Sequence, residues 1–167
     1  MSAFSSLEVK RPVWPTVVIF TLAFWLSASL MMDLVIMPGM YASGMMTQAG
    51  FATAGYMIFW VFNRIELFCA ALVLTGALVL DRTHFTAGNQ SRNAIILSSI
   101  LITIALVCTY VLSPEMSALG LNLNLFEPVA EVPGKMNLLH EGYWALEVLK
   151  LVAGGAILSL WYRANRS

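Results

Sequence analysis

Four long apolar stretches, separated by shorter polar segments, dominate the pattern of this chain. A helix needs about 20 predominantly apolar residues to cross the hydrocarbon core of a bilayer, and each stretch is near or above that length. The pattern therefore predicts an all-α fold, an integral membrane bundle of four transmembrane helices over residues 14–162. The predicted spans are 14–37, 56–80, 94–112 and 136–162, with polar segments at 1–13 and 163–167.

Two proline positions mark expected helix ends. Pro38-Gly39 is expected to stop the first helix, and Pro114 the third, because proline lacks the backbone N–H that a helix interior requires. Residues 38–54 then read as a loop or a short interfacial helix, and residues 114–135 as a longer loop.

The flanking basic residues predict how the bundle is oriented. Only Lys135 flanks the spans on one side. Since Lys and Arg are enriched in cytoplasmic loops, we expect both termini in the cytoplasm and the protein in the bacterial inner membrane or an equivalent internal membrane. The basic residues on the other side are Lys10, Arg11, Arg82, Arg92, Arg163 and Arg166.

The amino-acid composition of the chain also indicates a protein that lies in a lipid bilayer. The chain is 59% hydrophobic and 11% charged, whereas soluble proteins contain roughly 25% charged residues. Nine basic residues balance nine acidic ones, so no overall basic field attracts nucleic acid. Cys69 and Cys108 lie inside apolar stretches, where we expect buried free thiols.

The fourth stretch places ionisable residues where lipid is expected. At helical spacing, His140, Glu147 and Lys150 share one face, and Glu141 lies about 100° round from His140. The first and second stretches also carry polar residues. These candidates for a polar centre are Asp33, Asn63, Arg64, Glu66, His140, Glu141, Glu147 and Lys150.

Such residues must be paired, hydrated or protonated, because one ionised side chain at the bilayer centre costs about 2.5 to 3.5 kcal/mol on the insertion scale. Arg64 and Glu66 are two apart and do not face each other, so each is expected to find a partner on another helix. Glu147 and Lys150 can pair within their own helix. With Asp33, one negative charge remains in excess, which a proton or a metal cation could balance.

Two interpretations remain open for this polar centre. In one, the charges form an ion-pair network that fixes how the helices pack. In the other, they line a polar cavity open to the outer face, with His140 at its mouth and Glu147 at its floor.

Methionines give a second signal, because all except Met1 map to the outer halves of the spans or to the outer loops. Thioether and imidazole ligands favour Cu(I), so a copper site of His140, Met40, Met45 and Met46 is one hypothesis. The alternative is that these methionines only fill irregular gaps in the packing.

Three short motifs resemble those of the four-span family DUF4149, which is related to transmembrane protein 205. They are Asp33-Leu-Val-Ile-Met-Pro38, Phe59-Trp-Val-Phe-Asn63-Arg-Ile-Glu66 and Leu138-Leu-His140-Glu. That family is distantly similar to CopD-type copper-resistance proteins, and the resemblance implies a four-span fold with a link to metal handling.

The leading hypothesis for function is a small transport or cation-handling membrane protein. Its rival is an accessory or assembly subunit with structural charges. The chain contains no phosphate-binding loop, no dinucleotide-binding glycine pattern and no Cys-x-x-Cys, so the sequence supports no enzyme activity. Expected partners are the lipid bilayer and other membrane subunits or a second copy of the chain, and no nucleic acid.

Overall fold

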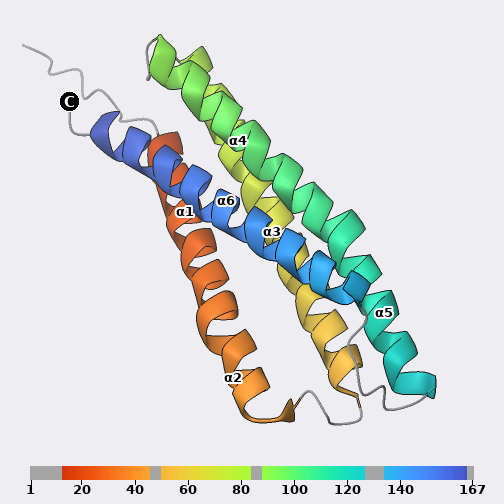
Figure 1. Cartoon of the computed structure of the whole chain (residues 1–167). Helices are drawn as coiled ribbons and strands as arrows, with labels where there is room; N and C mark the ends of the chain where they lie inside the picture. The colour runs from red at the N-terminus through yellow and green to blue at the C-terminus, as the bar shows by residue number, and fades with distance from the viewer. Residues whose placement is uncertain (1–12, 46–49, 84–87, 127–133, 165–167) are drawn as a thin grey trace, which may run out of the picture.

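The computed structural model describes residues 13–45, 50–83, 88–126 and 134–164, and every regular element within them is a helix (Figure 1). The helices are grouped into four long rods, and two of these rods contain a wider π-helical turn. The elements are α1 (Trp14–Met31), the π-turn η1 (Met32–Ile36), α2 (Met37–Ala42), α3 (Phe51–Arg82), α4 (Asn89–Val107), the π-turn η3 (Cys108–Leu112), α5 (Ser113–Phe126) and α6 (Gly134–Ala164).

These elements form four rods that are long and apolar enough to cross a membrane, in agreement with the four-span prediction. The four apolar segments are Trp14–Ala42, Thr53–Arg82, Asn89–Gly120 and Gly134–Arg163. Large apolar side chains such as Phe20, Phe68 and Val152 point outward and remain exposed. Outward apolar side chains of this kind are what a lipid-facing helix surface requires.

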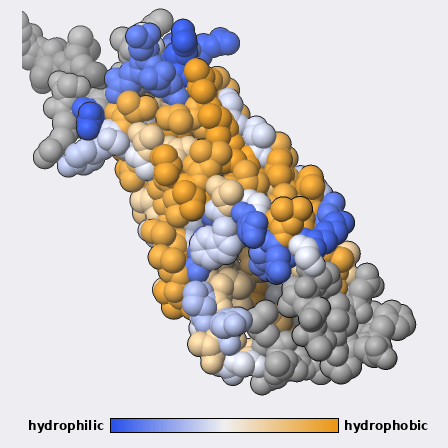
Figure 2. Space-filling view, viewed as in Figure 1, coloured by the Kyte–Doolittle hydropathy of each residue, from blue (hydrophilic) through white to orange (hydrophobic). Residues whose placement is uncertain are grey.

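The four rods close around a shared interior, because α3 and α6 each pack against both α1 and α4. The start of α1, the end of α3, the start of α4 and the end of α6 lie at one end of the bundle (Figure 1). We call it the arginine end, since Arg82, Arg92 and Arg163 lie there. Figure 2 shows hydrophilic side chains gathered at this end above an apolar surface.

Small residues let the helices approach closely in the arginine half of the bundle. A Cβ added at Gly76 of α3 would lie 2.1 Å from a methyl carbon of Val18, and one at Gly154 of α6 would lie 2.7 Å from a methyl carbon of Leu26. The surrounding core is apolar. It contains Val18, Leu22, Trp25, Cys69, Ala70, Val73, Ala77, Leu80, Ala94, Leu101, Ala105, Ala153, Ile157 and Trp161. Both cysteines are buried and free, as expected.

The structure corrects both predicted proline stops. The first rod continues through Pro38 to Ala42, and the third continues through Pro114 to Phe126. Residues 119–126, which fall within the predicted loop, are therefore helical. The predicted loop regions 38–54 and 114–135 each begin as helix.

A π-turn precedes each of these prolines and accounts for the difference. Met37 N–H bonds to Met32 O, and Ser113 N–H bonds to Cys108 O, five residues back instead of four. In a regular helix the proline ring would clash with the carbonyl four residues earlier. The wider turn moves that carbonyl aside, so the helix continues beyond the proline.

We predict that Gly76→Ala destabilises the bundle by about 1 to 3 kcal/mol, because the new methyl group overlaps the stiff Val18 side chain. Thermal unfolding in detergent measures the change. Gly155→Ala is the matched control, since nothing lies within 4 Å of its added Cβ. Equal unfolding temperatures for the two variants would show that the Gly76 contact does not limit the packing.

Candidate functional site: a buried carboxylate and lysine cluster

Lys150 of α6 holds the centre of a buried charged cluster. Its Nζ donates to Oε1 of Glu66 on α3, and it lies 2.7 Å from Oε1 and 2.6 Å from Oε2 of Glu147, one turn earlier on α6. All three side chains are about 1% exposed. The ammonium therefore joins two helices that are far apart in the sequence.

The first rod completes the surroundings of Glu66. Trp25 Nε1 and Ser29 Oγ of α1 donate to the same Oε1 atom at 2.9 and 3.0 Å. The Lys150 ammonium also lies 6.0 Å from the centre of the Trp25 ring, which gives a weak cation–π contact. One carboxylate oxygen thus accepts three donors from two other helices, and such bonds to a charged acceptor are the strong ones.

Asp33 brings a third carboxyl group into this cluster from the π-turn η1. It is 5% exposed, and its carboxyl group lies close to that of Glu147. A hydrogen bond between two carboxyl groups needs a proton on one of them. The second Asp33 oxygen, Oδ2, finds no hydrogen-bond donor among the described residues.

The cluster contains more negative than positive groups. Asp33, Glu66 and Glu147 would carry three negative charges if all were ionised, and Lys150 carries one positive charge. Burying two unbalanced charges is far more costly than pairing them. A proton held on Asp33 or Glu147 lowers this imbalance.

A second set of buried polar groups lies on the α5 side of α3. Asn63 Nδ2 donates to Ser113 Oγ at 2.6 Å, and Thr109 Oγ1 contacts the Asn63 carbonyl oxygen at 3.5 Å. Asn63 Oδ1 and the Tyr143 hydroxyl are buried without a hydrogen-bond partner in the described part of the chain. Tyr143 lies one turn before Glu147 on α6, and its ring packs edge-on against Phe59 at 5.8 Å.

The structure places Arg64 outside the polar centre, which corrects the expectation that it pairs with another helix. Its guanidinium carbon lies 3.7 Å from the centre of the Trp60 ring, and Nη1 donates to the Trp60 carbonyl oxygen at 3.3 Å. Arg64 points away from the bundle because Asn63 and Glu66 occupy the inward face of α3. Both observed contacts lie within its own helix.

The two ionisable residues at the start of α6 are also exposed. Glu141 and His140 lie on the surface, and His140 Nδ1 contacts the carbonyl oxygen of Met136 at 2.9 Å in the same helix. The structure therefore brings Asp33, Glu66, Glu147 and Lys150 together and leaves Arg64, His140 and Glu141 outside.

The proposed copper ligands are not gathered by the described residues. Met40 lies on α2, which packs against η1 but against none of the other described helices. Met45 is 41% exposed, and Met46 lies outside the described residues. Within the described ranges, no group of three or more His, Cys, Asp or Glu side chains could hold a metal ion.

Sequence reasoning missed four residues of the site. Trp25 and Ser29 precede Asp33 at intervals of four, so helical spacing could have identified one polar stripe on the first rod. Thr109 and Ser113 have the same interval on the third rod, for which we named no candidate site residue.

Comparison of the chain with protein-family models, with curated proteins and with solved structures finds no match. The resemblance to DUF4149 stays a prediction from the three sequence motifs.

We predict that Lys150→Met destabilises the folded protein by about 3 to 5 kcal/mol at neutral pH, because Glu66 and Glu147 lose their shared cation. Thermal unfolding in detergent measures the loss. Adding Glu66→Gln should restore part of it, since one buried negative charge is then removed. Arg64→Met is the control and should change stability by less than about 1 kcal/mol. Similar losses in the two single variants would contradict the central place of Lys150.

Proposed function

We propose that this protein is a small membrane transport protein that handles protons, and that Asp33 and Glu147 hold the moving proton. The observation that carries the proposal is the burial of three carboxyl groups, those of Asp33, Glu66 and Glu147, beside a single buried ammonium inside an apolar bundle. Ionisable residues within membrane spans are costly and typically mark ion or proton pathways. One ammonium cannot balance three ionised carboxyl groups, so we expect a proton on Asp33 or Glu147, and neighbouring carboxyl groups are suited to pass it on.

A proton fits this cluster better than a metal cation. The Lys150 ammonium already occupies the point where the oxygens of Glu66 and Glu147 converge. A metal ion at that point would meet a positive charge at hydrogen-bond distance, and the repulsion would oppose its binding. A proton needs no such space because it resides on a carboxyl oxygen.

Unsatisfied atoms support a transport role over a purely structural one. A network that only fixes helix packing is expected to satisfy its buried polar atoms. Here Asp33 Oδ2, Asn63 Oδ1 and the Tyr143 hydroxyl lack partners among the described residues. These three atoms lie on the side of the cluster away from the arginine end, where water would supply the missing bonds. Toward the arginine end, the buried Trp161 Nε1 also lacks a partner among the described residues.

The proposed direction of access follows from the basic residues. Following the positive-inside rule, we propose that the arginine end is cytoplasmic and that both termini lie inside. The core between the cluster and that end is largely apolar. We therefore propose that protons reach Asp33 and Glu147 from the outer face, in a bacterial inner membrane or an equivalent internal membrane.

Proton flux into liposomes that contain the purified protein tests the proposal, with an imposed pH gradient and an enclosed pH-sensitive dye. We expect flux above that of empty liposomes, and we expect Asp33→Asn and Glu147→Gln to abolish it, because an amide cannot release a proton. Glu141→Gln, at an exposed position of the same helix, should keep the flux of the unchanged protein.

Two outcomes would contradict the transport proposal. Flux equal to that of empty liposomes, together with unfolding of Asp33→Asn and Glu147→Gln, would favour the rival function of an accessory or assembly subunit with a structural ion-pair network. Undiminished flux in both folded variants would remove these two carboxyl groups from the pathway.

Metal content gives a separate prediction. Because protons are the proposed cargo, elemental mass spectrometry of protein purified after copper has been supplied should find no stoichiometric metal. His140→Ala should leave the metal content and the proton flux unchanged, since its ring contacts only a carbonyl of its own helix in the observed bonding. Stoichiometric copper that disappears in His140→Ala would instead support the Met and His site.

A further inference from the structure

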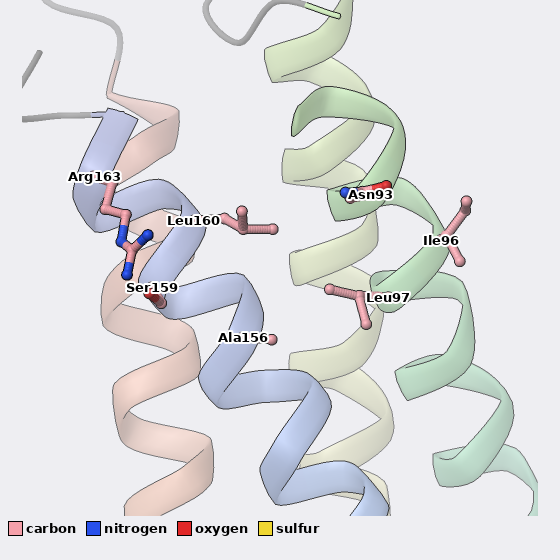
Figure 3. Close-up of a pocket in the computed structure, with 7 residues that line it drawn as sticks. All are labelled: Asn93, Ile96, Leu97, Ala156, Ser159, Leu160 and Arg163. Carbon is pink, nitrogen blue, oxygen red and sulfur yellow. The ribbon is translucent and has the colours of Figure 1, made fainter. Parts of the chain in front are cut away.

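A groove of about 490 Å³ lies between α4 and α6 at the arginine end, away from the charged cluster (Figure 3). This volume is within the range of small-molecule sites, roughly 300 to 1,000 Å³. Leu97 of α4 and Leu160 of α6 point toward each other across it. The lining residues are Asn93, Ile96, Leu97, Ala156, Ser159, Leu160 and Arg163.

The lining changes from polar to apolar along the groove. Asn93 and Arg163 lie toward the arginine end, and Leu97 and Ala156 lie nearer the middle of the bundle (Figure 3). A phospholipid has the same order, with a polar headgroup at the membrane surface and acyl chains directed to the bilayer centre. The groove is thus oriented along the bilayer depth as a lipid is.

The walls are held together across the top of the groove. Gln90 Nε2, in the first turn of α4, donates to the carbonyl oxygen of Leu160 on α6 at 2.8 Å. This bond links the two helices next to Asn93 and Arg163. A site that is already formed binds its ligand at a lower entropic cost.

Charge at this end selects among lipids. Arg82, Arg92 and Arg163 end or begin three neighbouring helices, so arginines outnumber the Asp81 carboxylate at this end. Arginine binds phosphate groups with two parallel hydrogen bonds and always remains charged. Basic residues next to a membrane span attract anionic lipid headgroups.

We infer that this groove binds an anionic phospholipid from the leaflet next to the arginine end. Arg163 contacts the phosphate and the net negative headgroup, Asn93 and Ser159 bond to the headgroup and the glycerol region, and one acyl chain lies along Leu97 and Ala156. This site is independent of the proposed proton transport.

Native mass spectrometry of the full chain in detergent tests the site, with phosphatidylglycerol and phosphatidylcholine of identical acyl chains as probes. We expect phosphatidylglycerol to bind more tightly. Arg163→Gln should weaken its binding about tenfold and weaken phosphatidylcholine binding less, so the preference for phosphatidylglycerol is reduced. Arg82→Gln, which removes a charge of the same end from a residue outside the groove lining, should keep the preference.

Blocking variants separate the groove from general charge at this end. Ala156→Phe fills the apolar part of the groove and should reduce the binding of both lipids. Ala145→Phe is the control, because Ala145 lies three turns earlier on nearly the same side of α6 and outside the groove. If Ala156→Phe fails to fold in a thermal unfolding assay, Ser159→Phe at the exposed groove rim is the second blocking variant.

Three results would overturn the inference. One is equal binding of the two lipids by the unchanged protein. Another is wild-type lipid binding by folded Arg163→Gln and by a folded blocking variant. The third is competition by glycerol phosphate as strong as that by phosphatidylglycerol, which would show that a soluble phosphate is sufficient for binding.

Discussion

The Lys150 ammonium is the interaction on which the interior of this protein depends. It lies between Glu66 of α3 and Glu147 of its own helix, and Glu66 in turn binds Trp25 and Ser29 of α1. Three of the four rods are therefore tied at one level of the bundle by a single cation. Removing Lys150 would leave Glu66 and Glu147 without a cation in a low-dielectric interior, where the penalty is several kcal/mol.

The two π-turns determine which side chains reach this level. Asp33 lies in η1 and Thr109 in η3, and each precedes a proline by five residues, Pro38 and Pro114 respectively. The first and third rods thus repeat one local device at matching depth. A π-turn carries an extra residue per turn and is frequent at functional sites. In this bundle, the π-turn that lets a helix continue past proline also places a polar side chain in the interior.

The parts of the fold that follow from local rules could be predicted from the sequence. Four apolar stretches of spanning length could form little else in a bilayer, because each backbone polar group must be satisfied within its own helix. The pairing of Glu147 with Lys150 followed from their spacing on one helix, and the observed ion pair confirms it. The helix extensions past Pro38 and Pro114 did not follow, because a proline is a helix stop unless the preceding turn widens, and nothing in the residue types specifies that widening.

Which residues form the site depends on how each helix is rotated about its own axis. The spacing of residues along the sequence does not determine that rotation. Arg64 and Glu66 are two residues apart, so at most one of them could face the interior, and the sequence favoured neither. The structure turns Glu66 inward, where it meets Lys150, and turns Arg64 outward onto Trp60. His140 is similarly outside, although it shares a helix with two cluster residues, because it precedes Glu147 by nearly two turns and lies close to the start of α6.

The bundle is asymmetric along its length, and this asymmetry determines what its interior can do. Toward the arginine end, helices approach through Gly76 and Gly154 and enclose an apolar core, a poor path for a charge. On the other side of Lys150, the interior carries Asp33, Asn63 and Tyr143, each with an atom that lacks a partner among the described residues. Under the proposed transport function, a proton that reaches Asp33 meets this apolar core beyond Glu66. Under the same proposal, further passage requires Lys150 to change partners, because its ammonium contacts both glutamates.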